Sequence, residues 1–178
     1  MRIPTFPMTR RFSKDATGAV AAEFALIVVP LFALIVVSLQ TAAIFFFDGA
    51  LQTAAEKSAR QLMTGSAQLS NLTQAQFKSA VCGNMPNFFQ CANLMVDVQS
   101  APTFSNLNTV PLTLTYNVAG AVTNTWNYNP GNPGDIVILR ALYNWPVVGG
   151  SLAVGLANQP NGNHLIVGTA VIKNEPYQ

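Results

Sequence analysis

Few side chains of this 178-residue sequence are of the types that perform catalysis. His164 is the sole histidine, which excludes a histidine-rich metal site and any mechanism that needs two imidazoles. His164 and Asp135 could complete a serine triad. Its nucleophile would be Ser105 or Ser151, but almost any sequence with serines and one histidine permits such a set. The residues therefore predict no enzyme, no metal site and no cofactor.

Three aromatic residues and one arginine in the C-terminal half each have two interpretations. Trp126, Tyr143 and Trp145 could line a surface groove for a carbohydrate or a protein, but aromatic side chains on a strand of a small sheet mostly pack in the core. Arg140 falls in the middle of a predicted strand, where it is either a solvent-facing residue or one half of an ion pair. The sequence leaves both questions open.

A long apolar stretch, residues 16–47, precedes the part of the chain that holds these residues. Glu23 is the only charged residue in this stretch. A membrane-crossing helix needs about 20 predominantly apolar residues, each adding about 1.5 Å. The stretch from Phe24 to Phe47 supplies that length without an ionisable group. Residues 19–47 are therefore predicted to form a transmembrane helix in contact with membrane lipid.

Charge is distributed unevenly around this stretch. Four of the nine Lys and Arg residues precede it, and the rest of the chain carries the other five against six of the seven Asp and Glu residues. Positive residues beside a membrane helix are retained in the cytoplasm. The N-terminus is therefore predicted to be cytoplasmic and the C-terminal domain to lie outside. No basic face remains for nucleic acid.

The two cysteines, Cys82 and Cys91, fall in the outward-facing part. An oxidising compartment such as a bacterial periplasm lets cysteines pair, and eight intervening residues would make a short closed loop. We therefore expect a disulfide between them. The alternative is two free buried thiols.

Downstream of Asp48 the apolar residues take the spacing of an amphipathic helix. Residues 48–65 should continue the membrane helix as far as Gly65, and a capping-box pair at Thr73 and Gln76 predicts a second helix to about Val81. Alternating residues predict strands at 94–98, 112–116, 135–143 and 165–172. The predicted fold is α+β. In it a long N-terminal helix, transmembrane and then amphipathic, packs on a small antiparallel sheet in a domain of residues 66–178.

Residues 18–24, GAVAAEF, resemble the cleavage motif of type IV prepilins and pseudopilins. In that family cleavage follows the glycine, and a glutamate is fifth in the mature chain. The resemblance implies that residues 1–18 are a cytoplasmic leader, cut by a prepilin peptidase between Gly18 and Ala19. It also implies that Ala19 becomes the first residue, commonly N-methylated, and Glu23 the fifth.

Glu23 needs a partner for a physical reason as well, because an ionised carboxylate at the edge of the hydrocarbon is costly and is normally paired. The free α-amino group of a neighbouring subunit would serve, and would set the axial register during assembly. Alternatively, Glu23 lies at the membrane interface, where the helix N-terminal dipole favours it. The Glu23–Phe24 pair resembles the Glu followed by an aromatic residue in the Flp pilins of tight-adherence (Tad) systems.

A narrower resemblance is to the TadE-like minor pseudopilins of Tad/Flp pilus machines. It implies a pilin-like fold and a structural subunit that helps to initiate or cap a thin adhesive pilus and so supports adhesion and biofilm formation. The implied partners are the prepilin peptidase, other pilins and pseudopilins, and the Tad assembly platform of the bacterial inner membrane. The alternative is an uncleaved, single-pass, membrane-anchored periplasmic binding domain. The segments that carry the resemblance are GAVAAEFALIVVPLFALIV, AAEKSAR, GDIVILRALYNWP and AVIKNEPY.

Overall fold

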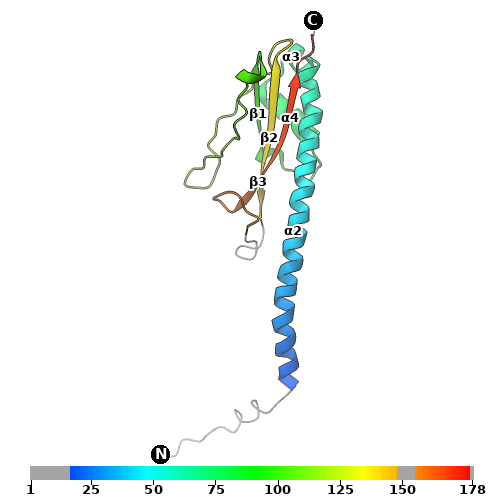
Figure 1. Ribbon diagram of the computed structural model, residues 1–178, viewed down its shortest axis with the longest axis vertical. Helices are drawn as coiled ribbons and strands as arrows, with labels where there is room; N and C mark the ends of the chain where they lie inside the picture. The colour runs from blue at the N-terminus through cyan, green and yellow to red at the C-terminus, as the bar shows by residue number, and fades with distance from the viewer. Residues whose placement is uncertain (1–16, 148–154, 177–178) are drawn as a thin grey trace, which may run out of the picture. The chain divides into compact units, whose positions relative to one another are not determined.

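The computed structural model describes residues 17–147 and 155–176, and the chain divides into two compact units after Gln40. Helix α2 (Thr17–Met63) supplies the first unit and continues into the second, which holds every other described element (Figure 1). The predicted α+β class, with a long N-terminal helix packed on a small antiparallel sheet, is confirmed. The other elements are α3 (Ser66–Leu69), α4 (Gln74–Gly83), η1 (Cys91–Asn93), β1 (Leu94–Ala101), η2 (Phe104–Asn106), β2 (Ile136–Pro146) and β3 (Asn163–Lys173).

Local sequence signals set the ends of the helices. The helix predicted to end at Gly65 ends at Met63, two residues earlier, and Gly65 follows in the left-handed conformation, with a φ of 73°, that favours glycine. At the start of α4 the predicted capping box is complete. The Thr73 hydroxyl accepts from the Gln76 backbone N–H, and the Gln76 side chain accepts from the Thr73 backbone N–H.

The sheet has three antiparallel strands in the order β1-β2-β3. Its register places Asp97 opposite Arg140, and Arg140 opposite Thr169. The strands predicted at 94–98, 135–143 and 165–172 are therefore confirmed. β1 and β2 each continue three residues beyond the predicted end, β2 starts one residue later than predicted, and β3 is longer by two residues at its start and one at its end.

The strand predicted at residues 112–116 is wrong. Side chains there alternate between partly buried and exposed as predicted, but only a single bridge forms, between Tyr116 and Val122. Two backbone hydrogen bonds flank this bridge, from the Thr123 N–H to the Thr115 carbonyl and from the Asn117 N–H to the Ala121 carbonyl, and beyond them the Asn124 side-chain amide takes the place of a ladder. It accepts from the Thr115 backbone N–H at 2.7 Å and donates to the Thr113 carbonyl at 2.9 Å. Because a side chain satisfies these groups, the segment does not need a neighbouring strand.

Small residues let α2 approach the sheet closely. The buried face of α2 in the second unit is rich in alanine, and Leu51 has no exposed surface. Gly168 of β3 lies against the α2 backbone, so that a β-carbon there would stand 2.8 Å from the Leu51 carbonyl oxygen. The core on this face of the sheet also takes in α4 through Phe77 and Val81. The buried α2 residues of this core are Leu51, Ala54, Ala55, Ala59 and Leu62.

Gln52 joins α2 to the open edge of β3. Its side-chain amide donates to the Thr169 carbonyl at 3.0 Å and accepts from the Thr169 backbone N–H at 2.9 Å. These are the two bonds that a neighbouring strand would make. Gln52 therefore covers the middle of an edge strand.

Candidate functional site

The residues of the predicted processing motif lie in the first two turns of α2. Gly18, Ala19, Glu23 and Phe24 are all exposed, and 68% of the Phe24 side chain is accessible. Ala19 and Glu23 are four residues apart, so they lie on the same face of the helix, one turn from each other. The bond between Gly18 and Ala19 thus lies in the first turn of α2. Of the predicted leader, residues 1–16 lie outside the described residues.

The surface around Glu23 is apolar. Between residues 18 and 47 no other side chain is ionisable, so within that stretch Glu23 has no charged partner. The large side chains of the first unit are exposed, including Leu26 at 77% and Leu34 at 66%. One helix, Gly18–Met63, is long and apolar enough to cross a membrane, with a mean hydropathy of 2.7 in its most apolar window.

Gly18 is not required by the packing of the described residues. A β-carbon added to it meets nothing within 4 Å, and its φ is not positive. Glycine inside a helix costs about 1 kcal/mol relative to alanine. The presence of glycine at this position therefore needs a cause other than the fold. Gly49, further along α2, is equally open.

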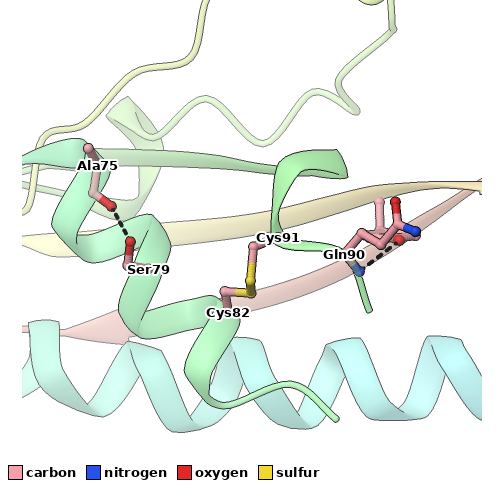
Figure 2. Close-up of a disulfide and its surroundings, with 6 residues drawn as sticks. Ala75, Ser79, Cys82, Gln90 and Cys91 are labelled. Carbon is pink, nitrogen blue, oxygen red and sulfur yellow. Dashed lines mark hydrogen bonds between the residues drawn. A yellow bond between two sulfur atoms is a disulfide. The ribbon is translucent and has the colours of Figure 1, made fainter. Parts of the chain in front are cut away.

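The predicted disulfide is present. Cys82 from α4 and Cys91 at the start of η1 are joined, with their Cα atoms 5.6 Å apart (Figure 2). The closed loop packs on the sheet, since Phe89 is buried and the Gln90 backbone N–H donates to the Tyr143 hydroxyl at 3.2 Å. The disulfide therefore fixes a loop against the end of β2.

Arg140 forms an ion pair with Asp97, which resolves a question that the sequence left open. Arg140 Nη1 lies 3.5 Å from Asp97 Oδ2, and the two side chains are 5% and 1% exposed. Asp97 also accepts from the Asn127 backbone N–H, and Arg140 donates to the Asn108 carbonyl. Alternation alone did not reveal this buried pair, because the covering residues come from the irregular segment between β1 and β2.

The sheet separates the members of the serine triad. His164 lies opposite Trp145, near the end of β2, whereas Asp135 immediately precedes the start of the same strand. Ten residues of extended chain correspond to about 33 Å. The histidine and the carboxylate therefore do not meet. Ser151 lies outside the described residues.

The three aromatic residues have different environments. Tyr143 is buried, and Trp145 stacks on Phe47 with ring centroids 3.8 Å apart, so both belong to the packed side of the sheet. Trp126 instead lines a hollow of about 750 Å³ beside the first residues of β1. Lys78 is the one charged residue there, and the other polar side chains of the lining are amides. The amide side chains are Gln74, Asn93, Asn144, Asn161 and Asn163.

Comparison with known proteins gives one family match, and it falls on the first helix. A family model described as TadE-like protein matches residues 18–60. This segment is TadE-like. The match begins at Gly18 and continues through most of α2, so the TadE-like segment includes the processing motif and the helix surface that packs on the sheet. The rest of the chain lies outside this match. No significant match was found among curated proteins or among solved structures.

Proposed function

We propose that this protein is a minor pseudopilin of a Tad/Flp pilus, held in a bacterial inner membrane by residues 19–47 after removal of residues 1–18. Residues 48–65 extend the helix, and residues 66–178 form the periplasmic domain. The observation that carries this proposal is the placement of Gly18, Ala19 and Glu23 at the exposed start of a TadE-like helix. Prepilin peptidase, other pilins and the Tad assembly platform are the proposed partners, and adhesion and biofilm formation the proposed outcome.

Gly18 supports cleavage at this position. The fold does not need a glycine there, whereas a peptidase that draws the chain into a narrow active site does gain from a residue without a β-carbon. The new N-terminus at Ala19 would bear a positive α-amino group one helical turn before Glu23. Both groups are exposed and so are available to a neighbouring subunit.

Glu23 supports assembly. Its carboxylate stands alone on an apolar surface, where an unpaired charge in hydrocarbon is costly. Pairing with the α-amino group of an adjacent subunit would remove that cost only in the correct axial register. The carboxylate would thus select one position of a subunit relative to its neighbour.

The first test is intact mass and N-terminal sequencing of the chain extracted from cells that carry the native peptidase. We expect a chain that starts at Ala19, and we expect Gly18→Ala to leave the leader attached. Gly49→Ala is the matched control, since it makes the same change at an equally open helical position. A mature chain that starts at Met1 would overturn the cleavage. Equal processing of the Gly18→Ala and Gly49→Ala variants would show instead that cleavage does not depend on Gly18.

The second test separates cleavage from assembly. The Glu23→Ala variant should be processed normally and yet fail to enter the pilus, and Glu23→Gln should behave the same because it keeps the size of the side chain but not its charge. Immunoblots of sheared pili measure incorporation. Normal piliation in both variants would count against the role of Glu23.

The hollow beside β1 favours a second candidate, an uncleaved anchored binding domain. Amides around one indole are suited to a neutral polar ligand such as a saccharide. In that case the chain starts at Met1, and Trp126→Ala abolishes saccharide binding followed by fluorescence titration. Trp145→Phe is the control, because Trp145 does not line the hollow. A chain that starts at Ala19 and binds no saccharide excludes this candidate.

A further inference from the structure

Aromatic rings gather where α2 meets the disulfide loop. Phe47 of α2 stacks on Trp145 of β2 at 3.8 Å and lies 5.2 Å from Phe88 of the loop. Phe46 lies 5.8 Å from Phe88, again between ring centroids. The inner rings of this cluster are covered, but the outer ones are not. The exposed fractions are 72% for Phe45, 60% for Phe46 and 48% for Phe88.

The sequence places this exposed aromatic patch at the end of the uncharged stretch. Phe24 to Phe47 contains 24 residues, which as an α-helix measure about 36 Å, against about 30 Å for the hydrocarbon of a bilayer. If Glu23 lies at the cytoplasmic boundary, the last four residues before Asp48 lie at the opposite boundary. Phe45 and Phe46 are among these residues, and Phe88 contacts Phe46.

We infer that Phe88, together with Phe45 and Phe46, inserts into the outer headgroup–acyl boundary of the bilayer, so that the domain has a second membrane contact besides its helix. This inference rests on the proposed insertion of α2 in a membrane. Aromatic and apolar side chains bind at this depth, about 5–10 Å into the boundary region. The closed loop carries no charged residue, so no charge has to be desolvated. Its residues between the cysteines are GNMPNFFQ.

The disulfide gives the contact its rigidity. Phe89 and Met85 of the same loop are buried in the core, while Phe88 faces outward. With both ends of the loop held at Cys82 and Cys91, little conformational entropy is lost when Phe88 enters lipid. Lipid is favoured over a protein partner because the patch is continuous with the apolar stretch of α2.

The test measures the depth of single reporters in vesicles of phosphatidylethanolamine and phosphatidylglycerol with brominated acyl chains. In the full chain carrying Trp126→Phe and Trp145→Phe, one variant adds Phe88→Trp. A matched control adds Phe104→Trp, since Phe104 is 61% exposed but belongs to η2, beyond the far end of β1 from the loop. A third variant adds Leu34→Trp, in the middle of the uncharged stretch, and reports whether α2 is inserted.

We expect bromine near the headgroups to quench about half of the fluorescence of the Phe88→Trp variant, as for a ring just below the headgroups. The Phe104→Trp variant should be unquenched, and the Leu34→Trp variant quenched most by deep bromines. Quenching of the Leu34→Trp variant alone would overturn this inference and leave the membrane helix intact. No quenching of the Leu34→Trp variant would overturn membrane insertion, and the inference with it.

A second measurement avoids the two Trp→Phe changes, in case they impair folding. Benzoylphenylalanine replaces Phe88 in the otherwise native chain, and the vesicles are irradiated. A phospholipid adduct supports the inference. An adduct with a second copy of the chain would show instead that the patch is a subunit contact.

Discussion

The two halves of α2 have the same backbone conformation but opposite surfaces. In the first unit Leu34 is 66% exposed, whereas in the second Leu51 is fully buried. The buried half uses small residues, and its alanines permit the close approach at Gly168. The exposed half uses large residues, and most of them stay accessible, as Leu26 and Leu34 do. Hydrophobicity therefore does not decide burial in this helix, and the presence of a fitted surface does.

The largest difference in stability should be between removing a buried charge and removing an exposed one. Asp97→Ala leaves the buried Arg140 without a counter-charge and should lower the free energy of unfolding by about 4 kcal/mol. Glu23→Ala, in the exposed half, should change it by less than about 0.5 kcal/mol. Urea unfolding of the full chain in detergent micelles, followed by tryptophan fluorescence, measures both. Similar losses would mean that Glu23 is part of the folded core.

The same leucine deletion in each half tests the comparison directly. Leu51→Ala removes a fully buried side chain and should cost about 3 kcal/mol in the same unfolding experiment. Leu34→Ala should have almost no effect on the unfolding of the domain, because no described residue covers it. An equal cost for the two variants would contradict the division of α2 into a packed and an unpacked half.

A glycine-to-alanine change should lower the stability at one position and raise it at another. At Gly168 the new β-carbon meets the α2 backbone at 2.8 Å, so the helix must move and about 2 kcal/mol of stability should be lost. At Gly49, where nothing lies within 4 Å, alanine should add about 0.5 to 1 kcal/mol through its helix propensity. A gain at Gly168 would show that α2 does not pack against β3 at this distance.

Alkaline pH should lower the stability of the domain, and this effect should be the smallest of those predicted here. Burial raises the pKa of Tyr128 above its ordinary value of 10.0. The folded state therefore holds the phenolic proton more tightly than the unfolded state, and this contribution is complete below pH 10 and is lost as the pH rises further. The urea midpoint should fall less steeply above pH 10 in Tyr128→Phe. Superimposable profiles for the two chains would remove Tyr128 as the cause.

Sequence reasoning succeeded where short-range signals dominate. The capping box at Thr73, the helix stop at Gly65 and the pairing of Cys82 with Cys91 all depend on residues close in the chain. The three strands of the sheet were also found, because an apolar or alternating run marks each of them in the sequence. These elements are the frame of the second unit.

The failures have two causes: a side chain that takes the place of a strand partner, and burial that depends on residues far apart in sequence. The alternation at residues 112–116 is real, but the Asn124 amide takes the bonds that a strand partner would make. Arg140 could not be assigned, because its burial depends on the segments around Asn108 and Asn127. The roles of Gly18, Ala19, Glu23 and Phe24 stay predictions, since they concern a peptidase and neighbouring subunits.

The amide of Gln52 has a consequence for self-association. An unprotected edge strand is a template on which a second copy can add by continuing the sheet, as in aggregation and domain swapping. Gln52 occupies the hydrogen-bonding groups in the middle of β3, so a second chain cannot bind along that edge without first displacing α2. If the protein enters a pilus as proposed, the pilus must therefore grow by contacts other than sheet extension at β3, and replacing Gln52 with alanine would expose the edge groups that a second copy could bind.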